Sequence, residues 1–201
     1  MLRDYTVVNV RDYLQKNSEG KTRQDVLEET ISCFSCPINK TIETFFKRQA
    51  IEFTKKNQSV TYLVFSKKDA ALVGYFTLAA KPIVVREALL SKTMQKKISR
   101  VSEYNQEQQT FHLSAYLIAQ LGKNFTNEAN RKITGQDLMH IARNKVKELQ
   151  YMLGGMVTFI EAEANDKLIE FYVKKNNFKK FDTRNANSVQ ACELVQMLGI
   201  L

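Results

Sequence analysis

The sequence contains few of the residues that form linkers, disulfide staples or membrane spans. Only 7 glycines and 2 prolines occur among 201 residues, so no flexible linker or low-complexity tract is present. The 3 cysteines, an odd number, exclude a disulfide framework. No apolar run approaches the roughly 20 residues of a membrane-spanning helix, and the start, MLRDYTVVNVRDYLQK, lacks the apolar core of a secretory signal. These absences predict a cytoplasmic protein that has no membrane partner.

The residues that are present form an ordinary globular composition with an excess of positive charge. The hydrophobic fraction is 44% and the charged fraction 25%, and 201 residues are enough for one domain with a full core. The formal net charge of +9 attracts anions. A nucleic acid, an anionic membrane face or a polyphosphate cofactor would all fit, and charge alone does not choose among them.

Hydrophobic periodicity predicts helices, then a hairpin, then alternating strands and helices. Gly74 is expected to mark a bulge or a close approach within the hairpin, and the polar residues 81–109 are left open as a helix or a surface insertion. The predicted elements are a strand and helix start up to about 17, helices 18–34 and 39–58, strands 59–66, 71–80 and 110–122, helix 133–153, strand 156–164, helix 165–175 and strand 177–181. This order predicts an α/β or α+β fold with a mixed sheet.

The tract LGKNFTNEANRKITGQDL, residues 121–138, leaves a buried strand and enters a helix at Gly135. A helix start offers unpaired N–H groups, and a glycine lets an anion approach the backbone. Arg131 and Lys132 add positive charge, so the loop can hold a pyrophosphate. Neither a full Walker A pattern nor GxGxxG is present. The residues alone favour the simpler alternative, a helix capped by Thr134.

Several segments, in the right order, resemble the GNAT acetyltransferase superfamily. TYLVFSKKDAALVGYFTL resembles its second and third strands, and YLIAQLGKN its fourth, whose backbone pairs with the pantetheine arm of acetyl-CoA. KITGQDLMHIA resembles its pyrophosphate loop, and NDKLIEFYVKKNNF its fifth crossover. FSCPINKTIETFFKRQAIEF is similar to a segment of the toxin-like branch, which acetylates aminoacyl-tRNA. The resemblance covers about residues 30–182.

The resemblance implies a single N-acetyltransferase domain over residues 1–201, with a core of about 30–182, an N-terminal helical extension and a C-terminal segment. Helices would flank a central mixed sheet whose parallel strands 4 and 5 splay apart. The implied cosubstrate is acetyl-CoA, without a metal, and the acceptor is a primary amine. The toxin-like branch adds aminoacyl-tRNA as acceptor, an antitoxin protein as partner and a homodimer as an assembly to consider. The alternatives are a catalytically weak module binding RNA or a protein, or an acetyltransferase for small amines or protein lysines.

The resemblance also assigns roles to residues. Tyr172 would be the general acid that protonates the leaving thiolate, since a phenol and an alkyl thiol have similar pKa values; core packing is the alternative. A backbone N–H near Leu121 would polarise the thioester carbonyl. The predicted cofactor-binding residues are Leu121, Gly122, Lys123, Lys132, Ile133, Thr134, Gly135, Gln136, Asp137, Leu138, Asn165, Phe171 and Tyr172.

Three positions depart from the superfamily pattern. Lys132 stands where Gln or Arg is usual, and a lysine is not a bidentate donor. Asp137 puts a carboxylate near the phosphates, which is tolerable if it points away or caps the helix. Asn176-Asn177-Phe178 replaces a Gly-Phe turn with one extra residue, and asparagine tolerates a left-handed helix end.

The general base is left open. Glu161 and Glu163 share one face of a strand, but solvated or paired charges are the favoured alternative, and His112 is a weaker candidate. His140 is expected to be structural. Cys33, Cys36 and Cys192 are expected to be buried or free thiols, because the CxxC lacks the second pair of a zinc site. Basic runs near aromatic residues can hold RNA or form a solvated face; they are Lys92, Lys96, Lys97 and Arg100, then Lys174 and Lys175, then Lys179 and Lys180.

Overall fold

The computed structural model describes residues 4–18, 20–185 and 193–201. The chain divides into two compact units, each built from two separate stretches. The first unit comprises residues 1–79 and 118–145, and the second comprises residues 80–117 and 146–201. Three long elements, two strands and a helix, run from one unit into the other along the chain.

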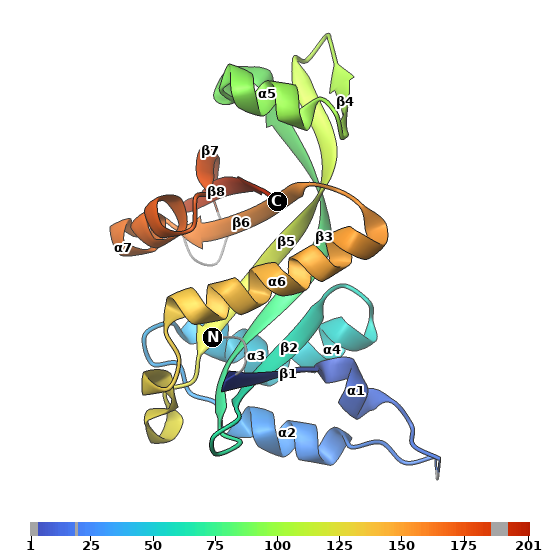
Figure 1. The fold of residues 1–201 in the computed structure, drawn as a ribbon, viewed down its shortest axis with the longest axis vertical. Helices are drawn as coiled ribbons and strands as arrows, with labels where there is room; N and C mark the ends of the chain where they lie inside the picture. Colours follow the sequence, from blue (N-terminus) through green and yellow to red (C-terminus); the bar gives the residue numbers. More distant parts are fainter. Residues whose placement is uncertain (1–3, 19, 186–192) are drawn as a thin grey trace. The chain divides into compact units, whose positions relative to one another are not determined.

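The first unit joins small helices to the start of a sheet. Figure 1 shows the first half of α6 crossing one face of β3 and β5, with α3 behind them. Its elements are β1 (Tyr5–Asn9), α1 (Val10–Leu14), α2 (Gln24–Ser32), α3 (Lys40–Arg48), α4 (Ala50–Lys55), β2 (Val60–Ser66), the start of β3 (Leu72–Arg86), the end of β5 (Thr110–Lys123), the 3-10 segment η3 (Thr126–Arg131) and the start of α6 (Gly135–Leu153).

The predicted helix over 39–58 is interrupted. Asn39 caps α3, as its side chain accepts the Ile42 amide N–H at 3.1 Å, but Gln49 leaves helical geometry (φ −122°, ψ −28°) and α4 begins after it. The apolar stripe continues through the break, and Phe46 and Ala50 are both fully buried. The prediction of one continuous helix was therefore wrong. Phe45, Phe46 and Ala50 of the expected apolar face are buried, whereas Phe53 is exposed.

An aromatic cluster fixes α3 onto the sheet of the first unit. The Phe46 ring stacks on Tyr75 of β3 with centroids 4.0 Å apart, and Phe34 meets both rings edge-on at 4.7 and 5.3 Å. The buried Tyr75 hydroxyl donates to the Ile42 carbonyl at 2.7 Å, which satisfies a polar group that burial would otherwise penalise.

Gly74 has both features that the sequence suggested. The register of β2 and β3 shifts beside it, because Val64 pairs with Gly74 and Phe65 pairs with Leu72. A β-carbon on Gly74 would also lie 2.7 Å from the carbonyl oxygen of Gly122. The glycine therefore permits close approach of β3 and β5.

The second unit contains the segment that the sequence left open. β3 continues to Arg86, beyond its predicted end, because Val85 and Ile83 join the buried core. The remaining elements are the 3-10 turn η2 (Glu87–Leu89), α5 (Lys92–Ile98), β4 (Ser102–Asn105), the start of β5, the end of α6, β6 (Val157–Glu163), α7 (Asp166–Glu170), the π-helical turn η4 (Phe171–Lys175), β7 (Lys179–Asn185) and β8 (Glu193–Ile200).

Eight strands among the described residues form one mixed sheet, in the order β1-β2-β3-β5-β6-β8-β7, with β4 pairing to β5. β5 and β6 are parallel, whereas β8 is antiparallel to both β6 and β7. The predicted mixed α/β fold is confirmed. The position of β8, between two strands that precede it in the sequence, was not predicted. No helix in the described part of the chain is long and apolar enough to span a membrane.

Candidate active site

The predicted site residues fall into two groups, one in each unit. The first unit holds the end of β5 and the start of α6, namely residues 121–123 and 132–138. The second unit holds Asn165, Phe171 and Tyr172. Each group has its own geometry and chemistry.

Gly122 and Lys123 are the last two residues of β5, and their β-positions point to opposite faces of the sheet. A β-carbon on Gly122 would lie 2.5 Å from Ile42 Cγ2 and 2.9 Å from Tyr75 Cε1, so the α3 face of the strand has no room for a side chain there. Lys123 points to the other face, since successive strand residues alternate. Its ammonium is half-buried, and burial lowers its pKa, while the Asp137 carboxylate acts in the opposite direction.

The loop before α6 is held from both sides. The Ile133 side chain is buried, and the Tyr5 hydroxyl of β1 donates to the Lys132 carbonyl at 2.9 Å. Leu138, in the first turns of α6, is also buried and lies against the place where Gly74 lacks a side chain. The predicted cofactor loop therefore has a fixed backbone.

Thr134 and Asp137 form a capping box at the start of α6. The Asp137 amide N–H donates to Thr134 Oγ1 at 3.0 Å, and the Thr134 amide N–H donates to Asp137 Oδ2 at 3.1 Å. The Thr134 hydroxyl donates to the same carboxylate oxygen at 2.6 Å. This is the capping arrangement expected for Asp137. It uses the Thr134 N–H group, which could otherwise donate a hydrogen bond to a phosphate.

The positive side chains of the loop are bonded to carboxylates. Lys132 forms an ion pair with Asp69, on the turn between β2 and β3, and this contact lowers the pKa of Asp69 to about 2. Arg131 pairs with Glu128 at 3.0 Å. Asp69 is a residue that the sequence did not single out. Only its place in the hairpin turn KKDA could have suggested a contact with a loop more than 60 residues away.

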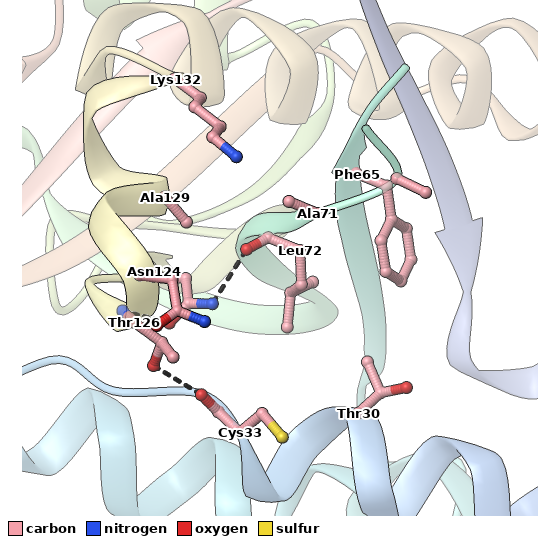
Figure 2. A pocket seen from close by; sticks show the side chains of 11 residues that line it. Thr30, Cys33, Phe65, Ala71, Leu72, Asn124, Thr126, Ala129 and Lys132 are labelled. Carbon is pink, nitrogen blue, oxygen red and sulfur yellow. Dashed lines mark hydrogen bonds between the residues drawn. The ribbon is translucent and has the colours of Figure 1, made fainter. Parts of the chain in front are cut away.

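A cavity of about 280 Å³ lies beside this loop, and Figure 2 shows the Lys132 side chain pointing into it. In its wall, the Asn124 amide donates to the Leu72 carbonyl at 2.9 Å, and the Thr126 hydroxyl donates to the Cys33 carbonyl at 2.5 Å. These bonds tie the loop to β3 and to the end of α2. The Lys132 side chain thus belongs to the packing of the hairpin and the loop.

The parallel pair of the second unit has a short register. β5 and β6 pair through Tyr116 with Thr158 and Leu117 with Phe159, although β6 continues to Glu163. At the start of β6, the Tyr116 hydroxyl bonds to the Gly154 carbonyl. Gly154 and Gly155 have φ angles of +81° and +84°, which end α6 as the sequence predicted.

Asn165 caps the helix that carries Tyr172. Its Oδ1 accepts the Lys167 and Leu168 amide N–H groups at 3.0 and 3.3 Å, so the predicted cap is confirmed. The α-helix ends at Glu170, and residues from Phe171 onward continue as a π-helical turn. A π turn accommodates one extra residue, which matches the additional residue before Phe178. Asn177 has φ +57°, the left-handed helix end expected of asparagine.

Tyr172 combines packing with an available hydroxyl. Its ring lies edge-on to Phe171 at 5.2 Å and to Phe178 at 6.1 Å. Burial raises the pKa of its phenol to about 12. The sequence analysis expected the phenol and an alkyl thiol to have similar pKa values, but the pKa of Tyr172 is higher. The phenol therefore keeps its proton throughout the neutral range. Such a group can donate a hydrogen bond to a developing thiolate.

Glu161 is a paired charge. Arg184 of β7 donates to its two carboxylate oxygens at 2.5 and 2.8 Å, and Gln196 of β8 donates at 2.9 Å. Burial acts to raise the pKa of the Glu161 carboxyl, but these partners together hold it below its ordinary value. Glu163 is exposed at the end of β6. Glu161 is thus a paired charge, which was the alternative favoured over a general base. The sequence analysis did not identify its partner, Arg184.

The remaining candidates lie outside both groups. His112, on β5, shares a hydrogen bond of 3.0 Å with Thr110, and His140 is exposed on α6. Cys36 is buried and Cys33 exposed, and both are free thiols as expected; Cys192 lies outside the described residues. The basic run from Lys92 to Arg100 lies on and just after α5.

Comparisons with models of known protein families and with curated proteins find no match. Solved structures do match. "AtaT complexed with acetyl-methionyl-tRNAfMet" is 19% identical, with a TM-score of 0.59 over 96% of this chain and 94% of that chain. A KacT mutant with one tyrosine replaced by phenylalanine is 18% identical, with a TM-score of 0.60 over 96% and 95%. AtaTR bound with AcCoA is 20% identical, with a TM-score of 0.56 over 98% and 95%. The fold expected from the resemblance is thus confirmed, and this chain has the fold of AtaT and KacT.

Proposed function

We propose that the chain is an N-acetyltransferase that moves an acetyl group from acetyl-CoA to a primary amine, with the aminoacyl group of charged tRNA as acceptor. One observation carries the proposal: the fold of nearly the whole chain matches AtaT, whose structure contains acetyl-methionyl-tRNA. A match to AtaTR bound with AcCoA supports the cosubstrate. The net charge of +9 suits a polyanionic acceptor.

The chemistry assigns one task to each group of residues. The acceptor nitrogen attacks the thioester carbonyl carbon, the carbon–sulfur bond breaks, and the nitrogen loses its proton to water or to a base that is not yet assigned. The backbone N–H near Leu121 would hydrogen-bond to the carbonyl oxygen as it gains charge. Tyr172 would donate its hydroxyl proton toward the departing thiolate.

Cofactor binding is assigned to the loop before α6 and to the cap of α7. The pyrophosphate would lie against residues 132–138 and the backbone of Leu121, Gly122 and Lys123. The amides of Lys132, Thr134, Asp137 and Leu138 already bond within the chain, so those of Ile133 and Gly135 are assigned to the phosphates. Asn165 and Phe171 would flank the cofactor arm beside Tyr172. A protein partner is also proposed, because a neighbour structure shows AtaT bound to the C-terminus of the antitoxin AtaR and acetyl-CoA.

Substitution of Tyr172 by phenylalanine tests the central assignment. The variant should bind acetyl-CoA as the parent does and transfer acetyl to purified methionyl-tRNA at least about 100-fold more slowly, the size of a general-acid contribution. Tyr151→Phe is the matched control, because Tyr151 is 93% exposed at the end of α6 and should leave transfer unchanged. Equal transfer by parent and Tyr172→Phe would remove Tyr172 from the mechanism.

A second candidate function has its own support. Three donors of the loop are already bonded to carboxylates, through Lys132 with Asp69, Arg131 with Glu128 and Thr134 with Asp137. This suits a catalytically weak module that binds RNA or a protein. A thermal-shift titration separates the two functions, because an enzyme should be stabilised by micromolar acetyl-CoA and the module should not.

A further inference from the structure

The basic side chains near the start of α6 differ in whether a carboxylate of the protein already binds them. Lys132 is bonded to Asp69, with side chains 37% and 40% exposed, and Arg131 is bonded to Glu128. A cation held by a neighbouring carboxylate loses most of its attraction for a further anion. The charges of Arg131 and Lys132 are therefore already neutralised.

Lys123, at the end of β5, differs from both. Among the residues that the structure describes, its ammonium has neither an ion pair nor a hydrogen bond. It is half-buried, and burial lowers its pKa; the Asp137 carboxylate offsets part of this effect without a hydrogen bond or an ion pair. Such an ammonium gains more from an anionic ligand than a solvated surface lysine would.

The position of Lys123 places this charge on the α6 side of the sheet. A β-carbon on Gly122 would point toward Ile42 of α3. Side chains alternate along a strand, so that of Lys123 points to the opposite face of the sheet. α6 crosses that opposite face (Figure 1). There the Leu138 side chain lies close to where a β-carbon on Gly74 would be, with its Cδ2 3.2 Å away. The Asp137 carboxylate also acts on the pKa of Lys123, which agrees with a location near the first turn of α6.

We propose that the ammonium of Lys123, and not that of Lys132, is the side-chain ligand of the cofactor pyrophosphate. The proposal rests on the proposed function, since it presumes that acetyl-CoA binds at the start of α6. It reverses the assignment that the superfamily pattern would give, in which the residue at position 132 supplies the side chain. Lys123 also offsets the negative charge that the Asp137 cap places beside the phosphates.

Substitutions at Lys123 and at the Lys132–Asp69 pair test the proposal. Lys123→Met should weaken acetyl-CoA binding by about tenfold or more, which is the loss of one charge-assisted hydrogen bond. The double variant Lys132→Met/Asp69→Asn, which removes this ion pair as a unit and keeps the local charge unchanged, should weaken binding much less than Lys123→Met does. Lys123→Arg should retain most of the affinity. Isothermal titration at low and high salt measures each constant, and the salt dependence should be weaker for Lys123→Met.

A phosphate-free donor separates binding from folding. Lys123→Met should slow transfer from acetyl-CoA, through a raised KM, more than it slows transfer from S-acetyl-N-acetylcysteamine, which has no pyrophosphate. Thermal unfolding without ligand checks that both variants remain folded. A loss of affinity in the Lys132→Met/Asp69→Asn variant that equals or exceeds the loss in Lys123→Met would overturn this inference alone. If the parent does not bind acetyl-CoA, the proposed function is overturned as well.

Discussion

Thr134 and Asp137 satisfy each other at the start of α6: each backbone N–H is received by the side chain of the other, at 3.1 and 3.0 Å. The departure from the superfamily pattern is thus a helix cap. The same carboxylate stabilises the helix and places negative charge where the proposed cofactor would bring more. Stability and cofactor affinity should therefore respond in opposite directions to its removal.

Asp137→Ala should lower the free energy of unfolding by about 1 kcal/mol, the usual contribution of a cap. Thr134→Ala should cost a similar amount, and the double variant should cost less than the sum, because the two residues share their hydrogen bonds. Urea titrations at constant m-value measure all three. Additive losses would mean that the residues do not act as a pair. The Asp137→Ala variant should also bind acetyl-CoA more tightly, as measured by isothermal titration.

The half-buried phenol of Tyr172 predicts a stability change at alkaline pH. Its pKa is raised from 10 to about 12, so the folded state holds a proton that the unfolded state releases first. The resulting stabilisation is fully present below pH 10 and is lost as the pH rises toward 12. Urea midpoints of the parent and Tyr172→Phe, compared from pH 8 to pH 11, should therefore converge or cross above pH 10. A constant difference across this range would show that the phenol is not shielded from water.

Glu161 and Arg184 predict a stability change at acidic pH. Glu161→Gln should destabilise the fold by about 2 kcal/mol, less than a fully buried pair would, because the Arg184 side chain is 42% exposed. The pKa of Glu161 is lowered, so its contribution is present above about pH 4.5 and disappears as the pH falls. The difference between parent and variant should shrink from pH 7 to pH 4. A fall in turnover at unchanged stability would instead return Glu161 to the list of candidate bases.

Gly122 predicts a packing defect in the first unit. A β-carbon there would meet Ile42 Cγ2 at 2.5 Å and Tyr75 Cε1 at 2.9 Å, so Gly122→Ala should cost about 1–3 kcal/mol. Ile42→Leu, whose side chain has no γ2 methyl group, should recover part of the loss in the double variant. Denaturant unfolding of the parent, the two single variants and the double variant measures the interaction free energy between the two positions. No recovery would indicate that Tyr75 is the obstacle.

The sequence predicted features whose causes are local. The cap at Asn165, the helix end at Gly154 and the left-handed Asn177 follow from the chemistry of single residues, and all three are present. The mixed sheet followed from the order of strands and helices together with the superfamily resemblance.

The features that the sequence missed depend on distant contacts. Asp69 meets Lys132 and Glu161 meets Arg184 across 63 and 23 residues, and no local pattern marks either pair. The break in the helix at Gln49 also lies within a continuous apolar stripe, so periodicity could not locate it. The continuation of β3 to Arg86 depends on the core that Val85 joins.

The location of β8 has a consequence for synthesis on the ribosome. β6 and β7 are made first, yet each pairs with β8, which is the last of the described strands to be translated. Until residue 200 has emerged, both earlier strands present open hydrogen-bonding edges that other nascent chains can join. Chaperone demand during translation should therefore concentrate on this half of the polypeptide.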